Sequence, residues 1–99
     1  MSGKKAKFSH YDVANYLKNA EELAAYLTAC MEEAGDDAAY IAAALGDVAR
    51  AKGMIQLAKD TRISLEGLYK ALSRDGNPSL GTVLKVVKAL GLKLTAKVA

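Results

Sequence analysis

The residues whose types and spacing offer the clearest chemistry lie between positions 64 and 73. If this stretch forms a helix, Leu68 and Leu72 are spaced i to i+4 and share one face. The side chains on its outer face are mostly polar or charged: Ser64, Leu65, Glu66, Tyr69, Lys70 and Ser73. Such a set can reach base edges in the major groove of DNA, where donors and acceptors distinguish the base pairs.

A helix-turn-helix over residues 54–72 would position these side chains. Leu57 faces inward from a short first helix, Ile63 falls in the turn, and the Ser64 hydroxyl can cap the second helix. Arg62 stands where this turn favours a left-handed residue, at a cost of roughly 1 kcal/mol for a side chain other than glycine. The same spacing also permits two ordinary helices packed in a small bundle.

Charge is divided unevenly along the chain. The net charge of +3 combines eight basic and three acidic side chains after residue 53 with six basic and eight acidic ones before it. The basic half therefore coincides with the predicted helix-turn-helix, as expected of a surface that neutralises phosphates. We expect Arg62 and Arg74 to contact phosphates and Glu66 to accept from a cytosine amine. Scattered lysines that only keep a small domain soluble are the alternative.

The remaining sequence predicts an all-α protein, a compact helical bundle. Apolar residues make up 52% of the chain and charged residues 25%, with one proline, a composition that favours helices around one core. Cap residues and apolar spacing predict a short helix over residues 11–17 and three longer ones. The longer helices begin at Asn19, at Asp36 or Asp37, and at Ser79, and they end at Gly35, Gly53 and Gly91.

The chain divides into a mobile leader at residues 1–7 and a single helical domain at residues 8–99. Within that domain we expect N-terminal helices over 8–35, a helix-turn-helix core over 36–92 and a tail over 93–99. Residues 92–98 alternate apolar and polar side chains, which is typical of a short β segment. A lone strand needs a partner chain to complete its hydrogen bonds, so a loose tail is the alternative.

Catalysis finds little support in the residue types. The only histidine, His10, lies near the predicted leader, and the only cysteine, Cys30, belongs to an apolar helix face. No glycine-rich phosphate loop or metal-ligand spacing appears, so we expect neither an enzyme nor a cofactor. The single cysteine favours a reducing compartment, and no stretch approaches the roughly 18 apolar residues of a membrane helix. These features predict a cytoplasmic protein.

Several segments together resemble the addiction-module antidote proteins, bacterial antitoxins of the Xre-type, lambda-repressor-like class. They are YDVANYLKNAEELAAYL, AALGDVARAKGM, SLEGLYKALS and GNPSLGTVLKVVKALGLKL, which cover most of the chain. The resemblance implies an all-helical homodimer that binds the operator of its own operon. It also implies a partner toxin of the RelE and HigB kind, an mRNA-cleaving enzyme held inactive by its antidote.

Two positions depart from the pattern of that class. Arg62 replaces the usual glycine of the turn, and Met54 occupies the position where a glutamine commonly contacts DNA phosphate, with Gln56 close by. Gln56 is therefore included among the expected DNA contacts. Two other functions remain open: a module that binds only protein, and a general Xre-type regulator without an antitoxin role.

Overall fold

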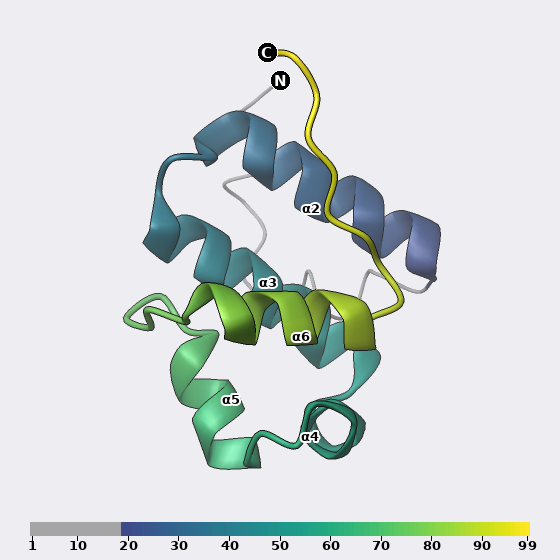
Figure 1. Ribbon diagram of the computed structural model, residues 1–99, viewed down its shortest axis with the longest axis vertical. Helices are drawn as coiled ribbons and strands as arrows, with labels where there is room; N and C mark the ends of the chain where they lie inside the picture. The colour runs from purple at the N-terminus through teal and green to yellow at the C-terminus, as the bar shows by residue number, and fades with distance from the viewer. Residues whose placement is uncertain (1–18) are drawn as a thin grey trace.

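A computed structural model describes residues 19–99, and the described part of the chain is all-helical (Figure 1). This confirms the predicted fold class. The predicted leader over 1–7 and the predicted helix over 11–17 lie outside the described residues. The helices are α2 (Ala20–Ala34), α3 (Ala38–Lys52), α4 (Met54–Thr61), α5 (Leu65–Ala71) and α6 (Leu80–Ala89).

The helix boundaries follow from local hydrogen bonds that the sequence predicted. Asn19 accepts from the backbone N–H of Glu22 at 2.8 Å and caps α2, and Asp37 accepts from that of Tyr40 at 3.1 Å and caps α3. Ser79 caps α6 in the same way. These side chains satisfy N–H groups that a helix leaves free in its first turn.

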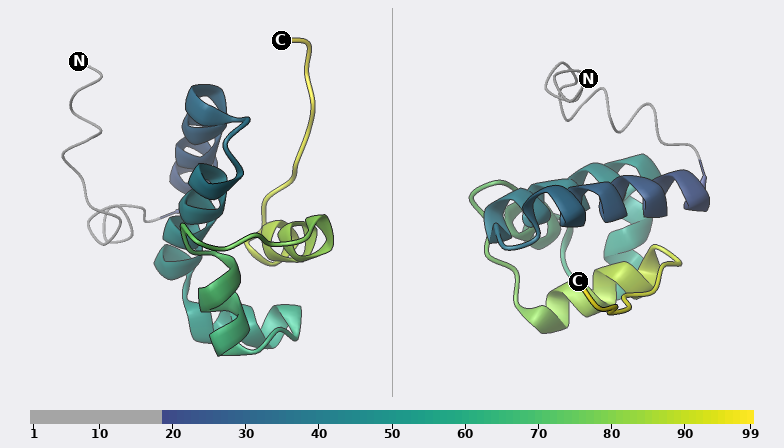
Figure 2. Two further views of the ribbon diagram at one scale, coloured as in Figure 1. Left: turned by 90° about the vertical axis from the view of Figure 1, so that its left-hand side faces the viewer. Right: turned by 90° about the horizontal axis from the view of Figure 1, so that it is seen from above.

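All five described helices contribute buried side chains to one core, and α2 packs against α3. Figure 1 shows α3 running back beneath α2, and Figure 2 shows α4 and α5 at the end of the molecule away from α2. Large side chains with almost no exposed surface fill the centre: Leu45, Val48, Leu57, Leu68, Val86 and Leu90. Each such burial stabilises the fold by about 1.5–3 kcal/mol.

Two predicted apolar faces are partly wrong: the apolar spacing predicts Met31 on the buried face of α2, and Leu80, Val83, Leu84, Val87 and Leu90 on that of α6. Met31 on α2 is 42% exposed, and Leu80 and Leu84 on α6 are 70% and 48% exposed. The buried residues of α6 are Val87, which that spacing predicts, and Val86, which it does not. Because α6 carries apolar residues on more than one face, its periodicity fits two rotations of the helix about its axis, and packing against α4 selects one of them.

A buried carboxylate joins α2 to α3. Asp47 is completely buried, accepts a hydrogen bond from the hydroxyl of Tyr26 at 2.6 Å and pairs with Arg50 at 2.5 Å. Burial and the neighbouring carboxylate raise the pKa of Tyr26 above its ordinary value. These partners compensate the burial of the Asp47 charge, and no pattern in the sequence predicts them.

The predicted C-terminal β segment is absent from the described chain. Residues 92–99 are extended but unpaired, and most of their side chains are exposed. Leu92 packs against the edge of the core, and the Lys97 ammonium lies 4.0 Å from the Glu32 carboxylate. No neighbouring strand of the described chain is available to pair with this tail, so its apolar alternation does not produce a ladder.

Candidate nucleic-acid interface

The turn between α4 and α5 takes the predicted left-handed conformation. Arg62 has φ 62° and ψ 24°, a region that side chains other than glycine rarely adopt. Thr61 supports it: its buried hydroxyl donates to the Leu57 carbonyl at 2.8 Å and accepts from the Ile63 N–H at 3.3 Å. These bonds fix both sides of Arg62, whose side chain stays exposed. Sequence reasoning missed the role of Thr61.

The helix α5 is held by its inner face. Leu68 is fully buried, and Leu72, which caps the helix, is 3% exposed. Gly46 of α3 packs directly against the Leu72 carbonyl, where no side chain would fit. The predicted helix-turn-helix is therefore present as two short helices, α4 and α5, packed on α3.

The outer face of α5 carries most of the predicted DNA contacts. Glu66 and Lys70 are exposed, and Leu65 and Tyr69 are 39% and 51% exposed. Ser64 is exposed, but its oxygen already accepts from the Gly67 N–H at 2.9 Å, so toward DNA its hydroxyl is better placed to donate. The structure thus brings five of the predicted residues together at one end of the molecule.

Ser73 does not lie on the outer face of α5, contrary to the sequence-based prediction. The helix α5 ends at Ala71, and Ser73 is half-buried beyond its cap. Its hydroxyl donates to the Lys70 carbonyl at 3.0 Å, so it closes the end of the helix. A loop containing Gly76 and Pro78 follows, and a serine just past a helix end commonly turns back to a free carbonyl in this way.

Two further predicted residues lie outside α5. Arg74 is exposed in the loop that follows the helix. Gln56 is exposed on α4, and its amide donates to the Asp60 carboxylate at 2.9 Å. That bond lies along the surface of α4 between residues four apart. The hydrogen bond to Asp60 uses the amide nitrogen of Gln56 and not its amide oxygen.

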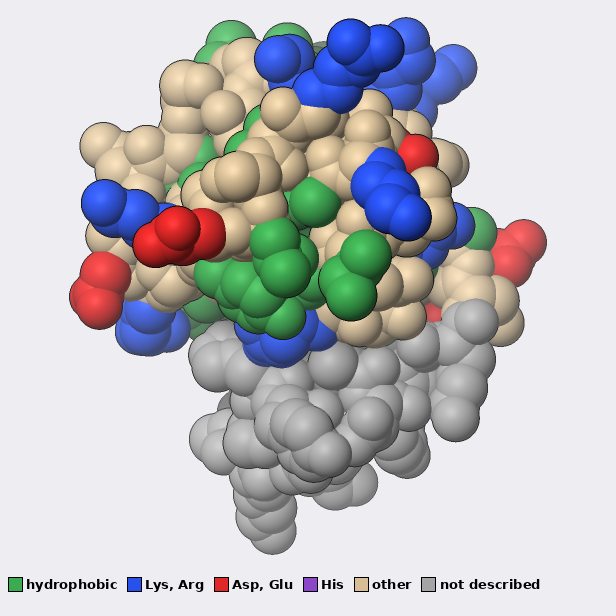
Figure 3. All heavy atoms as spheres, turned by 90° about the horizontal axis from the view of Figure 1, so that it is seen from below, with side chains coloured by type: hydrophobic (Ala, Val, Ile, Leu, Met, Phe, Trp, Pro, Cys, Tyr) green, Lys and Arg blue, Asp and Glu red, His purple; other side chains and the backbone are tan. Residues whose placement is uncertain are grey.

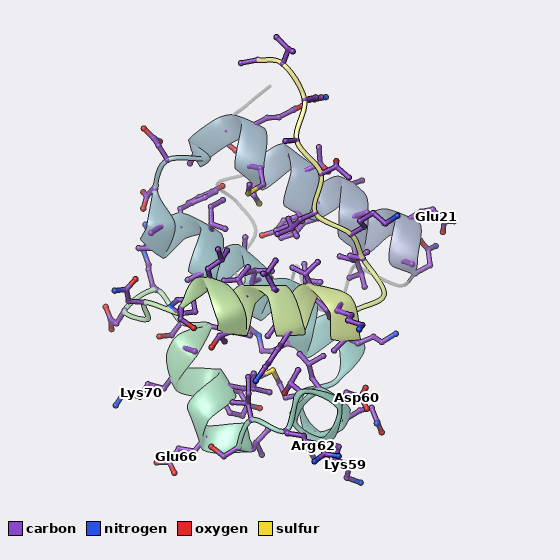
Figure 4. The ribbon with its side chains drawn as sticks, in the orientation of Figure 1. Glu21, Lys59, Asp60, Arg62, Glu66 and Lys70 are labelled. Carbon is purple, nitrogen blue, oxygen red and sulfur yellow. The ribbon has the colours of Figure 1, made fainter. Side chains whose placement is uncertain are left out.

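Figure 4 shows that Lys59 and Arg62 point outward at the end of α4, and that Glu66 and Lys70 project from α5 at the same pole of the molecule. Viewed toward this pole in Figure 3, an apolar patch lies near the middle of the face, and Lys and Arg side chains gather along its upper edge. Ile55 of α4, which sequence reasoning missed, is 65% exposed. The face therefore carries apolar and cationic groups together with the carboxylates of Asp60 and Glu66.

The described residues offer little for catalysis. Cys30 is 4% exposed, and burial raises the pKa of its thiol, so the reactive thiolate is disfavoured. Within residues 19–99, no group of His, Cys, Asp and Glu side chains could hold a metal ion. In the same range, no helix is long and apolar enough to cross a membrane.

Comparison of the sequence with known proteins places the chain in a family. Residues 7–98 match the sequence profile of the family described as "Probable addiction module antidote protein". The chain is also similar to a protein of Haemophilus influenzae strain Rd described as "Uncharacterized protein", with 52% identity over 83 residues, which cover 84% of each chain. No solved structure matches. Antidote proteins of this family are not enzymes, and an antidote implies a partner toxin. The chain belongs to the addiction module antidote family.

Proposed function

We propose that the protein is an antitoxin of the Xre, lambda-repressor-like type that represses its own operon and directly binds its toxin in the cytoplasm. The observation that carries the DNA-binding part is the exposed face of α5, fixed from behind by Leu68, Leu72 and the close contact at Gly46. A recognition surface must be held rigidly to discriminate bases, and this packing provides that support.

The dimensions of α5 suit a major groove. An α-helix with its side chains is about 10–12 Å in diameter, and the major groove is about 12 Å wide. Leu65, Glu66, Tyr69 and Lys70 would meet base edges, with Glu66 accepting from a cytosine amine and Leu65 contacting a thymine methyl. Arg62, Arg74 and Gln56 would contact phosphates and set the register.

One such helix contacts too few base pairs to specify an operator. We therefore propose a homodimer that binds two half-sites about one helical turn, roughly 34 Å, apart. This spacing is itself testable by footprinting, because the protected half-sites should be centred about 10 base pairs apart or a multiple of that distance.

The toxin-binding part is supported by the opposite charge of another region. Acidic side chains flank the turn between α2 and α3, at the other end of the molecule from α4 and α5 (Figure 1). They are Glu32, Glu33, Asp36 and Asp37. We propose a RelE-like or HigB-like toxin, an mRNA-cleaving enzyme, as the partner, since a protein that binds RNA is typically basic and complements this region. A module that binds only the toxin is the competing function.

A mobility-shift experiment separates the two functions. The purified protein is mixed with the roughly 100 base pairs upstream of its gene, with and without the product of the neighbouring gene, against unrelated competitor DNA. Retardation that survives competitor and weakens steeply as salt rises is the expected result. Binding of the neighbouring gene product without any specific retardation would favour the protein-binding module instead.

A further inference from the structure

A depression between the end of α4 and the outer side of α6 carries a cluster of cations that the recognition helix does not include. Its lining residues are Asp60, Thr61, Arg62, Lys85, Lys88 and Ala89. Lys85 and Lys88 are three residues apart on α6 and exposed, on the side of that helix away from buried Val86 and Val87. Residues so spaced are neighbours on a helix surface. Segments more than 20 residues apart in sequence therefore contribute to one basic hollow.

We propose that Arg62, Lys85 and Lys88 bind phosphate groups of the DNA backbone in this depression, beside the groove that α5 enters. This inference rests on the proposed DNA binding and extends its contact surface from α4 and α5 to α6. It assigns to Lys85 and Lys88 the task of positioning the protein on the duplex, without reading its sequence.

The charge balance of the depression supports an anionic ligand. Three side chains that line it are cationic, and one, Asp60, is a carboxylate. The Asp60 carboxylate already accepts a hydrogen bond from the Gln56 amide on its own helix. The wall therefore carries a net positive charge, and its open shape admits a backbone phosphate that projects from a duplex.

The position of the depression supports DNA as the source of that phosphate. Arg62 belongs both to the depression and to the turn that begins α5, only two residues before the capping Ser64. A duplex that α5 enters consequently passes close to Arg62, and Lys85 and Lys88 lie across the hollow from it. The cations along the upper edge of the face in Figure 3 agree with a backbone path on this side.

The test compares two doubly substituted proteins of equal net charge. One carries Lys85→Gln and Lys88→Gln, and the control carries Lys93→Gln and Lys97→Gln in the exposed tail. Binding of each protein to a labelled duplex with the upstream sequence, and to an unrelated duplex of equal length, is measured by fluorescence anisotropy between 50 and 200 mM salt. Circular dichroism verifies that both variants remain folded.

Loss of two phosphate contacts should make the slope of log affinity against log salt shallower by about 2. Between 50 and 200 mM salt, the affinity of the wild type should therefore fall by a factor that is roughly ten times larger than the factor for the α6 variant. The effect should be equal on both duplexes, because phosphates carry no sequence, and the tail control should keep the wild-type slope.

Two results would overturn the inference alone: an α6 variant with the slope of the tail control, or one weakened only on the upstream sequence. A wild-type protein that binds neither duplex would overturn the proposed DNA binding itself, and this inference with it. The wild-type measurement thus separates the two failures.

Discussion

Gly46 of α3 lies directly against the backbone carbonyl of Leu72, the residue that caps α5. A Cβ atom at position 46 would overlap this carbonyl oxygen, which cannot move without moving the end of α5. The position of α5 on α3 therefore depends on the absence of a side chain at one buried position. Glycine inside a helix usually lowers the stability of the protein relative to alanine. At position 46 it is favoured nevertheless, because it permits this close approach of α3 to the end of α5.

Gly46→Ala should destabilise the protein by about 1–3 kcal/mol, because the overlap outweighs the better helix propensity of alanine. The matched control is Gly81→Ala on α6, where a Cβ would meet only the Ser79 hydroxyl at 3.8 Å. That change should be neutral or stabilising by up to about 1 kcal/mol. Urea unfolding monitored by circular dichroism measures both, and equal stabilities of the two variants would refute the packing argument.

Tyr26→Phe removes the hydroxyl that donates to the buried Asp47 carboxylate. A hydrogen bond to a charged group contributes about 1.5–3 kcal/mol, so a loss of that size in the free energy of unfolding is expected. Tyr69→Phe, on the exposed face of α5, should change stability by less than about 0.5 kcal/mol. A Tyr26→Phe protein as stable as the Tyr69→Phe protein would mean that this bond contributes nothing.

The same tyrosine predicts a stability change at alkaline pH. Because the pKa of Tyr26 is raised in the folded state, the unfolded chain releases this proton at lower pH than the folded one does. The stabilisation by the Tyr26 hydroxyl is therefore complete below a pH of about 10, which is the pKa of tyrosine in the unfolded chain. It is lost as the pH rises further. The stability difference between wild type and Tyr26→Phe should therefore narrow above that pH. If the stability difference between the two proteins stayed constant up to the highest usable pH, the pKa of Tyr26 would not be raised by folding.

Arg62 has a strained left-handed backbone and a positively charged side chain. Two substitutions distinguish the effect of the strain on stability from the effect of the charge on DNA affinity. Arg62→Gly relieves the left-handed strain of roughly 1 kcal/mol and removes the cation, whereas Arg62→Ala removes the cation and keeps the strain. The glycine variant should therefore unfold at higher temperature than the alanine variant, while both lose operator affinity to a similar degree. Equal melting temperatures in a calorimetric comparison would show that the turn is unstrained.

The helix ends could be predicted from the sequence because local interactions determine them. Asn19, Asp37, Ser64 and Ser79 cap their helices through side-chain oxygens that lie within three residues of the N–H they accept from. The left-handed turn at Arg62 was predicted for the same reason. Such features require no knowledge of how the helices pack.

Features that depend on packing could not be predicted in this way. The apolar spacing predicts Leu80 and Leu84 in the core, but both are exposed because contact with α4 selects the rotation of α6. The early end of α5, which leaves Ser73 off the outer face, depends on the closure of the following loop. Lys85 and Lys88 join Arg62 only after folding, although their spacing of three on a helix was visible in the sequence.

The central claim is that the outer face of α5 contacts operator DNA, and Lys70 tests it most directly. Lys70 projects from this face in Figure 4, and neither the core nor a cap depends on its side chain. The measurement is the dissociation constant of wild type and Lys70→Ala on the upstream duplex at one fixed salt concentration, with Lys93→Ala as the control. The account predicts a loss of about 1–3 kcal/mol, roughly five- to 150-fold in affinity, for Lys70→Ala alone. An unchanged dissociation constant would contradict the claim that this face of α5 binds the operator.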